Sequence, residues 1–358
     1  MMKAAVCYEF GKPLVVEEVD IDSPKEGEVK VRMGTTAICH SDIHVIRGEF
    51  GIRLPVLAGH ESAGYIEEIG ENVTLVKPGD AVVVSLLASC GRCPQCVSGR
   101  PYMCQFRWPL NRESRLHNKQ GQDINHMTRT ATFAEYAIVH ESQAVPIPED
   151  MPIDRAALLA CGVITGFGAV VRTARVKALS SVVVIGCGGV GLNSVQGAAL
   201  AGAYPVIAVD VLDNKLEAAR TFGATHIVKA SNENAIQTVQ ELTNRGADYV
   251  LVTVGSTAAI QQGFAMSGPH GMIVVAGLPP MAESITLPSS LTWQERMVTH
   301  SLMGSTVLSV EIPKLVALYQ AGRLKLDELI TGRYPLEQIN EAIEAVERGE
   351  ALRNVIMF

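Results

Sequence analysis

Two cysteines and one histidine, far apart in the sequence, have the residue types of a metal site. His60 lies in the run Gly59-His60-Glu61, Cys39 lies upstream of it, and Cys161 lies far downstream. Two thiolates and one imidazole leave the fourth position of a tetrahedral zinc ion open, which is the arrangement of a catalytic zinc. The sequence therefore predicts a catalytic zinc with Cys39, His60 and Cys161 as its ligands.

Four more cysteines lie close together in the sequence, at Cys90, Cys93, Cys96 and Cys104. Four thiolates fill every position of one zinc ion, so a zinc bound there has a structural role. Clustered cysteines in a chain without an export signal are more often metal ligands than disulfides. The alternative is four reduced thiols in a loop. We expect a structural zinc, and hence two zinc ions per chain.

A glycine-rich turn connects a predicted strand to a predicted helix. The apolar run at 181–185 is typical of a buried parallel strand, and the turn that follows holds five residues with the spacing of a dinucleotide site: Gly186, Gly188, Gly189, Val190 and Gly191. Such a turn places a pyrophosphate at the N-terminus of the helix. The alternative is a strand–helix–strand unit that binds no nucleotide.

Asp210 closes the next predicted strand, about twenty residues after the glycines, where this fingerprint expects an acidic residue. Its carboxylate would accept hydrogen bonds from the ribose hydroxyls and would repel a 2'-phosphate. The sequence therefore favours NAD over NADP as the cofactor.

Strands and turns dominate the first part of the chain, where proline and glycine separate short alternating runs. Residues 105–130 are polar and without periodicity, which indicates a long loop with His117 and His126 in solvent. A strand follows at 132–139. A helix is predicted from Asp154, as its N-cap, to residue 160. After it, three glycines would leave room for a cofactor near the backbone: Gly162, Gly166 and Gly168.

From residue 180 the predicted strands alternate with helices, which is typical of a doubly wound parallel sheet. The strands are at 181–185, 205–210, 226–229, 249–254 and 272–277, and the helices are at 192–201, 215–222, 233–244 and 258–264. Beyond residue 303 the chain should return to the first domain. An amphipathic helix is predicted at 335–346, with a stripe of Leu336, Ile339, Ile343 and Val346, and a last strand at 352–358.

These elements define an α/β protein of two domains, since 358 residues exceed the usual size of one hydrophobic core. The β-rich domain comprises 1–162 and 303–358, and the dinucleotide-binding domain comprises 163–302. The net charge of -7 gives no electrostatic case for nucleic acid or an anionic membrane as a partner. The N-terminus has no signal peptide pattern, and the apolar runs near 81–88 and 182–192 are too short or too glycine-rich to span a bilayer. We expect a cytoplasmic protein.

The frame Gly59-His60-Glu61, continued by Gly64, Gly70 and Val73, resembles the signature of the zinc-containing alcohol dehydrogenases of the medium-chain dehydrogenase/reductase superfamily. The resemblance extends over nearly the whole chain. It implies a GroES-like catalytic domain, a Rossmann domain, and reversible hydride transfer between NAD and a primary alcohol or its aldehyde, aromatic alcohols included.

Four other functions, three enzymatic and one non-catalytic, are alternatives to this one. Two are an NADPH-preferring aldehyde reductase, which Asp210 disfavours, and a secondary-alcohol/ketone dehydrogenase of the same fold. The third is a zinc-free quinone reductase, which would lack the cysteine ligands that are present here. The fourth, from a different class, is a non-catalytic zinc- or nucleotide-binding protein.

The resemblance also assigns roles near the catalytic zinc. Ser41 would lie beside the reacting oxygen, and His44 would pass the alcohol proton on, through the cofactor ribose, to solvent. Asp42 would orient the His60 ring. Glu61 would lie behind the metal, as a transient ligand, as a charge that tunes the field, or as a buried, paired carboxylate.

The cofactor contacts and the pocket come from the same resemblance. His40 and Arg353 would contact the pyrophosphate, with a surface salt bridge as the alternative for Arg353, and Lys215 would contact the ribose. The nicotinamide carboxamide would meet backbone groups near Ala276, Leu278 and Ser301. The substrate pocket would be mostly apolar, with Phe50, Leu86, Trp108 and Leu278 as its wall.

A homodimer is the expected assembly. Residues 272–277 and 284–288 would pair across a two-fold axis at the sheet edge, as in the family. The long 105–130 loop is closer to the family's dimeric members, and a homotetramer is the alternative.

Overall fold

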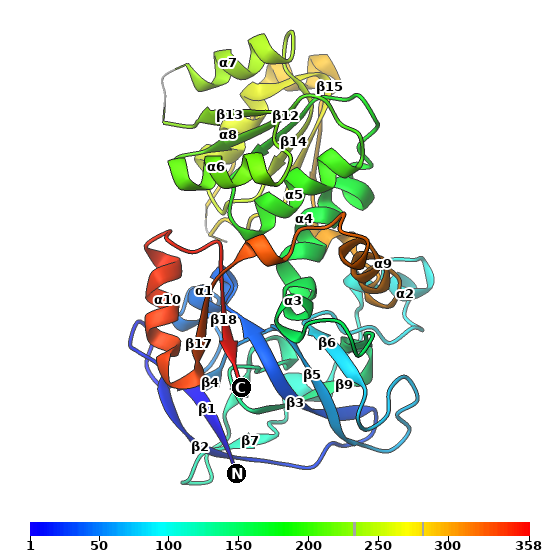
Figure 1. Cartoon of the computed structure of the whole chain (residues 1–358), viewed down its shortest axis with the longest axis vertical. Helices are drawn as coiled ribbons and strands as arrows, with labels where there is room; N and C mark the ends of the chain where they lie inside the picture. Colours follow the sequence, from blue (N-terminus) through cyan, green and yellow to red (C-terminus); the bar gives the residue numbers. More distant parts are fainter. Residues whose placement is uncertain (232–233, 281–282) are drawn as a thin grey trace. The chain divides into compact units, whose positions relative to one another are not determined.

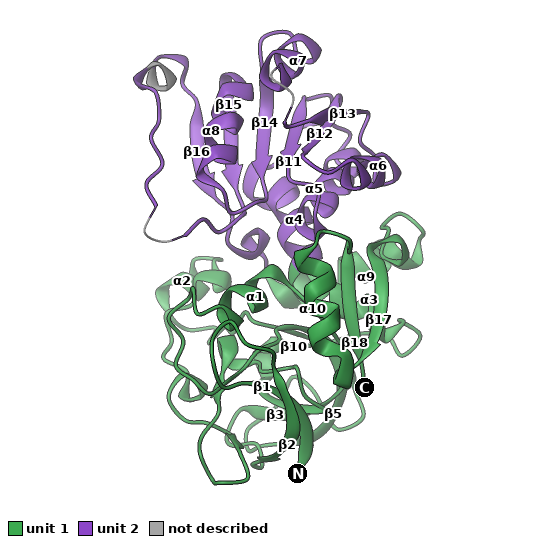
Figure 2. Ribbon diagram, turned by 90° about the vertical axis from the view of Figure 1, so that its left-hand side faces the viewer, with its two compact units in different colours: residues 1–161, 307–358 green, residues 162–306 purple. Residues whose placement is uncertain are grey.

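The computed structural model describes residues 1–231, 234–280 and 283–358. The chain divides into two compact units (Figure 2). The first unit combines Met1–Cys161 with Val307–Phe358, and the second is Gly162–Thr306. The first unit therefore contains both ends of the described chain (Figure 1).

The larger sheet of the first unit is organised around strand β3 (Glu28–Ala37). Strand β3 pairs antiparallel with β5 (Glu61–Ile69), β9 (Tyr136–His140) and β18 (Arg353–Met357). The sheet is completed by β6 (Ala81–Ser85), β10 (Ala144–Pro146) and β17 (Ile330–Pro335). The predicted final strand is confirmed, and its pairing joins the C-terminal segment to strands from the first half of the chain.

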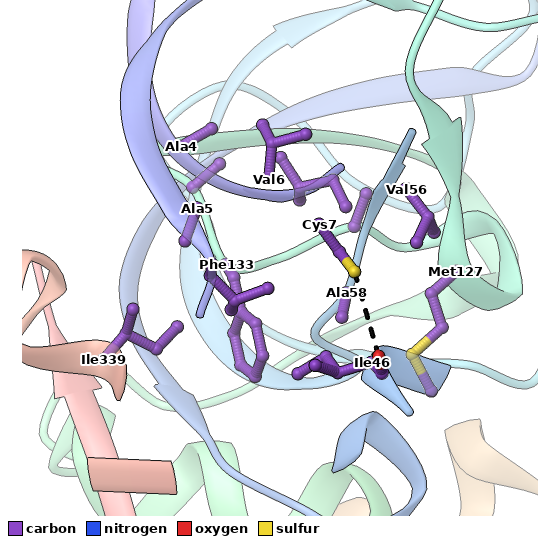
Figure 3. Packing of buried hydrophobic residues seen from close by; sticks show 14 of the residues in the cluster. Ala4, Ala5, Val6, Cys7, Ile46, Val56, Ala58, Met127, Phe133 and Ile339 are labelled. Atoms are coloured by element: carbon purple, nitrogen blue, oxygen red, sulfur yellow. Dashed lines mark hydrogen bonds between the residues drawn. The ribbon is translucent and has the colours of Figure 1, made fainter. Parts of the chain in front are cut away.

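A second, smaller sheet of this unit contains the first two strands of the chain. Its strands run in the order β7 (Leu116–His117), β2 (Val15–Ile21), β1 (Met2–Cys7), β4 (Val56–Leu57) and β8 (Asn125–His126). Apolar side chains of β1 and β4 pack with Phe133, Met127 and Ile339 (Figure 3). Ile339 begins helix α10 (Ile339–Glu347), and all four residues of the predicted apolar stripe are buried. The amphipathic pattern thus identified the buried face of this helix.

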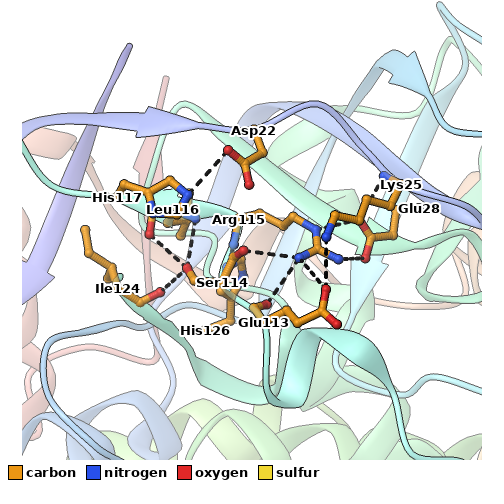
Figure 4. A network of polar contacts seen from close by, with 10 residues as sticks. All are labelled: Asp22, Lys25, Glu28, Glu113, Ser114, Arg115, Leu116, His117, Ile124 and His126. Atoms are coloured by element: carbon orange, nitrogen blue, oxygen red, sulfur yellow. Dashed lines mark hydrogen bonds and ion pairs between the residues drawn. The ribbon is translucent and has the colours of Figure 1, made fainter. Parts of the chain in front are cut away.

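The segment 105–130 is more ordered than its polar sequence suggested. Two of its short stretches form β7 and β8. The Arg115 side chain is only 1% exposed, and its Nε and Nη2 donate to the two carboxylate oxygens of Glu28 at 2.9 and 2.8 Å (Figure 4). A buried bidentate pair of this kind has strong geometric specificity. The segment is therefore tied to the start of β3.

His126 is half-buried, so the prediction that it lies in solvent is wrong for its ring nitrogens only. Its Nε2 accepts a hydrogen bond from the backbone N–H of Arg115 at 3.1 Å, and its buried Nδ1 has no hydrogen-bond partner among the described residues. Burial, with the neighbouring Arg115 charge, lowers the pKa of His126 to about 4, so the ring stays neutral near pH 7. His117 keeps partial exposure and contacts Asp22 and Asp123.

The second unit is built on six parallel strands in the order β13-β12-β11-β14-β15-β16. The chain starts at β11 in the middle, proceeds to one edge and then to the other, as in a doubly wound sheet. The bounds are β11 Val182–Ile185, β12 Val206–Asp210, β13 His226–Lys229, β14 Ala247–Val252, β15 Ser267–Val275 and β16 Met297–His300. The predicted α/β fold is confirmed.

Helices connect these strands. They are α5 (Gly189–Leu200), α6 (Asp213–Thr221), α7 (Ala235–Leu242) and α8 (Thr257–Met266). Residue 233, the first of the helix predicted at 233–244, lies outside the described residues. The other helices of this region lie within a few residues of their predicted bounds.

One helical stretch, Ile153–Ala174, is long and apolar enough to cross a membrane, but most of it is buried as in a core helix. It comprises α3 (Ile153–Leu158), α4 (Ile164–Gly168) and two π-helical segments, η5 (Leu159–Val163) and η6 (Ala169–Ala174). Asp154 is not its N-cap, as the sequence suggested, because Pro152 holds that position. The Asp154 carboxylate instead pairs with Arg155 and Arg333.

Two glycines of this stretch are required by packing. A Cβ on Gly166 would lie 2.1 Å from the carbonyl oxygen of Val190, and one on Gly168 would lie 2.4 Å from that of Gly304. The interpretation that these glycines leave room for a cofactor is therefore wrong, since protein backbone occupies that space.

Candidate metal centre and cofactor crevice

The three predicted ligands of the catalytic zinc converge within the first unit. Cys39 precedes helix α1 (His40–Ile46), His60 precedes β5, and Cys161 lies in the π-helical segment η5. One ligand atom from each lies within 4.8 Å of the others, and all three residues are buried. We call this set the Cys–His–Cys cluster. Two thiols and one imidazole are suitable ligands for zinc.

Asp42 is fully buried and connects two members of the cluster, Cys39 and His60. Its Oδ1 accepts hydrogen bonds from His60 Nδ1 and Gly59 N, and its Oδ2 accepts one from Cys39 N, each at 2.9 Å. Because Nδ1 donates to Asp42, the lone pair of the neutral His60 ring is on Nε2. That atom is buried without a hydrogen-bond partner among the described residues, as a metal-binding nitrogen would be before it has its metal.

The charges around the cluster favour a cation. Burial disfavours a charged His60 ring, but Asp42 and Cys39 outweigh this effect and raise the pKa of His60 well above its ordinary value. Contact with Cys161 lowers the pKa of Cys39; burial opposes this effect, and His60 adds to it. The pKa of Cys161 is raised by Cys39 and by burial. The Asp42 carboxylate and the thiols thus favour a positive charge at this site.

Ser41 and His44 occupy successive turns of α1. Ser41 Oγ lies 3.9 Å from Cys39 Sγ, so its hydroxyl borders the cluster. The His44 side chain is one-third exposed, its Nδ1 contacts the Glu49 carboxylate, and its ring packs 5.3 Å from that of Phe50. Both residues are half-buried, and the structure places Ser41 beside the cluster and His44 one turn further along α1. Sequence reasoning missed Glu49, whose only signal was an acidic residue shortly after the helix.

Arg353 and Glu61 form a buried pair beside the cluster. Arg353 Nη2 lies 3.4 Å from Glu61 Oε2, and Nη1 donates to the carbonyl oxygen of Ile38 at 3.3 Å. Both side chains are almost entirely buried, so the alternative of a surface salt bridge for Arg353 is wrong. Burial lowers the pKa of Arg353, but Glu61 and the two thiols outweigh it and raise the pKa. His40, by contrast, is exposed.

The four clustered cysteines also converge, with their sulfur atoms within 4.8 Å of one another. Cys93 Sγ lies 3.5 Å from Cys96 Sγ and 3.9 Å from Cys104 Sγ. Backbone N–H groups lower the pKa of Cys93 to about 6, whereas burial and Cys93 raise that of Cys96 to about 12. Four convergent sulfur ligands on an irregular lobe fit a structural zinc.

The predicted pocket residues have different surroundings. Phe50 lies against His44, and the Leu86 carbonyl accepts a hydrogen bond from Arg129 Nη2 at 3.1 Å. Trp108 is buried, packs on His140 and Phe106, and lines a cavity of about 20 Å³ whose lining includes no member of the Cys–His–Cys cluster. Leu278 is 45% exposed in the second unit.

The glycine-rich turn of the second unit has the geometry that the sequence predicted. Gly186 has φ +91°, and a Cβ there would lie 2.4 Å from Val254. A Cβ on Gly191 would lie 1.7 Å from the Gly186 carbonyl oxygen. Gly188 has open space around its missing Cβ and directly precedes α5, whose first residues are Gly189 and Val190. The turn thus leaves free space at a helix N-terminus, where a pyrophosphate is stabilised.

Asp210 borders a cavity of about 650 Å³, the cofactor crevice, lined among others by Gly186, Val211, Ala230, Ser256 and Gln262. Its Oδ2 accepts a hydrogen bond from Cys187 N at 2.6 Å, and its Oδ1 accepts one from Leu212 N at 2.9 Å. Lys215 is mostly buried in α6. These backbone contacts fix the carboxylate at the carboxyl end of β12, where open α/β sheets bind ligands.

The predicted nicotinamide contacts also follow strands of this sheet. Ala276 comes directly after β15 and donates its N–H to the Val252 carbonyl at 2.8 Å. Ser301 comes directly after β16, is 1% exposed, and donates its N–H to the Val275 carbonyl at 2.9 Å. Both lie at the same edge as the cofactor crevice.

Comparison with known proteins gives matches to both parts of the chain. Residues 25–149 match the family described as alcohol dehydrogenase GroES-like domain, and residues 189–321 match the zinc-binding dehydrogenase family. The chain is 39% identical over 366 residues to an NDMA-dependent alcohol dehydrogenase of Amycolatopsis methanolica, covering 99% of this chain and 98% of that protein.

Two further relatives are similar over their full lengths. The S-(hydroxymethyl)glutathione dehydrogenase of Saccharomyces cerevisiae is 37% identical over 369 residues, covering 99% of this chain and 95% of the relative. The crystal structure of benzyl alcohol dehydrogenase from Acinetobacter calcoaceticus aligns with a TM-score of 0.93 at 32% identity, covering 100% of this chain and 99% of that one. The chain therefore belongs to the zinc-containing alcohol dehydrogenases of the medium-chain dehydrogenase/reductase superfamily.

Proposed function

We propose that this chain catalyses NAD-dependent, reversible oxidation of a primary alcohol, aromatic alcohols included, to its aldehyde. The observation that carries the proposal is the buried Cys–His–Cys cluster, with the unpartnered Nε2 of His60 and the hydroxyl of Ser41 beside it. Two cysteines and one histidine are ligands already known for catalytic zinc in alcohol dehydrogenases. The similarity to a benzyl alcohol dehydrogenase supports an aromatic substrate.

The chain has separate candidate sites for the two groups that the proposed reaction requires, a zinc ion and NAD. Cys39, His60 and Cys161 would hold zinc, and the cofactor crevice with Asp210 would hold NAD. When bound, zinc would polarise the substrate oxygen as a Lewis acid, and NAD would accept the hydride. Asp42 keeps His60 in the tautomer that presents Nε2 to the cluster. Arg353 supplies a buried positive charge close to the two thiols.

Ser41 and His44 are proposed to remove the alcohol proton. A hydroxyl can donate and accept at the same time, so Ser41 can pass a proton outwards. His44 lies one turn further along α1 and contacts the Glu49 carboxylate, which can hold the ring in one orientation. An imidazole suits this outer step because a neutral ring has one nitrogen that donates and one that accepts a hydrogen bond.

The alternative functions would require different properties of the same residues. An NADPH-preferring reductase would need a positive group for the 2'-phosphate, whereas Asp210 is a fixed carboxylate in the cofactor crevice. A secondary-alcohol dehydrogenase would share every contact described above and differ only in its substrate. A non-catalytic protein would not need a hydroxyl beside an open cluster.

We further propose that the protein is a homodimer formed at strand β16, with a homotetramer as the alternative. The expectation that residues 272–277 lie at the sheet edge is wrong, because residues 272–275 belong to β15, which pairs with β14 on one side and with β16 on the other. The edge strand is β16, on which Met297 and Val298 are about half exposed. Ile285 and Leu287 of the neighbouring segment are also exposed. Pairing with a second copy would cover the free edge of β16, which has no second strand partner among the described residues.

The cofactor preference is the first prediction. The wild-type protein should oxidise benzyl alcohol with a higher kcat/KM for NAD than for NADP. The Asp210→Asn variant keeps the shape of the side chain but loses the charge, so its NADP/NAD ratio of kcat/KM should rise by about tenfold, a ~1.4 kcal/mol effect. Assays should be repeated with NDMA added, because one relative is NDMA-dependent. A wild-type preference for NADP would contradict the proposal.

The metal content is the second prediction. Elemental analysis of the purified protein should give two zinc ions per chain. Cys39→Ser should lose one ion together with turnover, whereas Cys93→Ser should lose the other ion and mainly lower the melting temperature. Cys7→Ala, in the core and outside both clusters, is the control and should retain both ions. One zinc per chain in the wild type would show that the two clusters do not both bind metal.

The proton path is the third prediction. Ser41→Ala should remove most alcohol oxidation, by ~10²–10⁴-fold, while zinc and NADH still bind. His44→Gln should slow the reaction at or below the low end of that range, because solvent can partly replace a partly exposed group. Small external bases should partly restore its rate. Equal damage from both substitutions would mean that the proton leaves by another route.

The assembly is the fourth prediction. Light scattering should give a mass about twice the 38.3 kDa of the chain. Met297→Lys should lower that mass towards one chain, since an edge lysine opposes strand pairing. Leu179→Lys, at another exposed apolar position of the same unit, should leave the dimer intact. A wild-type mass of one chain would rule out any oligomer, and a fourfold mass would favour the tetramer.

A further inference from the structure

Two neighbouring side chains of segment η6 hold a turn that follows strand β16. The Thr173 hydroxyl lies 2.8 Å from Ser301 Oγ and 2.9 Å from Ser305 Oγ. The Arg172 Nε donates to the Ser305 carbonyl oxygen at 2.8 Å. Thr173 thus bridges both ends of the turn 301–305, and Arg172 fixes its far end. Segment η6 is π-helical, a geometry that often occurs at functional sites.

The turn itself is strained. Met303, Gly304 and Ser305 have φ values of +48°, +67° and +51°, and two of these residues are not glycine. Left-handed backbone in ordinary residues persists only where the surrounding contacts impose it, and such residues cluster at ligand sites. Gly304 is required by packing, because a Cβ there would lie 2.1 Å from the Ile164 carbonyl oxygen. The hydroxyl bridge is among the contacts that keep this geometry.

The turn begins at the edge of the sheet where a dinucleotide would bind. Ser301 directly follows β16, and its N–H is bonded to Val275 at the end of β15. A doubly wound sheet consists of two halves that bind the two nucleotides of the cofactor. Gly186 and Asp210 belong to the half proposed for the adenosine part, so the turn lies at the half left for nicotinamide.

We propose that Thr173 is a positioning residue for the nicotinamide end of the cofactor. The proposal rests on the proposed use of NAD. A carboxamide is recognised through hydrogen bonds of fixed direction, so the backbone that meets it must be held still before it binds. Thr173 acts through Ser301 and Ser305, whose hydroxyls it holds, and does not itself touch the cofactor.

Binding of NADH and of ADP-ribose, which lacks nicotinamide, tests this role. Thr173→Val removes the hydroxyl and keeps the β-branched shape, and Thr173→Ser keeps the hydroxyl. Calorimetry should show NADH binding about three- to tenfold weaker in Thr173→Val, the loss expected for one hydrogen bond. ADP-ribose binding should be unchanged in both variants, and Thr173→Ser should bind NADH nearly as the wild type does. Ser305→Ala, which removes one partner, should weaken NADH selectively if Thr173→Val does not fold.

Three results would overturn the inference. Unchanged NADH affinity in Thr173→Val and Ser305→Ala would show that the bridge has no effect on nicotinamide. An equal loss for NADH and ADP-ribose would show a general structural role in the second unit. A wild-type protein that binds neither compound would remove the proposed use of NAD, and this inference with it.

Discussion

The buried carboxylate of Asp42 joins two segments that are distant in the sequence, the start of helix α1 and the turn before strand β5. It accepts hydrogen bonds from the backbone N–H groups of Cys39 and Gly59 and from His60 Nδ1. Without it, these three buried donors would be unpaired, at a cost of ~1–3 kcal/mol each. The same contact decides which ring nitrogen of His60 faces the thiols. The positions of Cys39 and His60, two of the three members of the cluster, therefore depend on one side chain.

The second unit provides the candidate dinucleotide site, whose shape is set mainly by its backbone. Gly186 and Gly191 let strand, turn and helix approach closely, and Gly188 leaves the helix N-terminus open. Asp210 is held by two backbone N–H groups, so its charge is fixed before any ligand arrives. Proteins of many functions share this sheet, so these few positions, and not the fold, favour NAD.

The parts predicted from the sequence are those whose chemistry demands a residue type. Thiols and imidazoles are common zinc ligands, and a tight turn with positive φ favours glycine, so the candidate ligands and the glycine-rich turn could be predicted from the sequence. The Arg115–Glu28 pair could not be predicted, because it buries two charges 87 positions apart in the sequence. The prediction that Gly166 leaves room for a cofactor was wrong, because the sequence does not show whether a cofactor or the protein backbone lies close to a glycine.

Anomalous diffraction from crystals at the zinc absorption edge tests the central claim most directly, since it locates the metal without reference to activity. The account predicts one peak among Cys39 Sγ, His60 Nε2 and Cys161 Sγ, with protein–metal distances of about 2.0–2.3 Å, and a second peak among the four clustered cysteines. A crystal of fully zinc-loaded protein with a peak only at the four cysteines would contradict it.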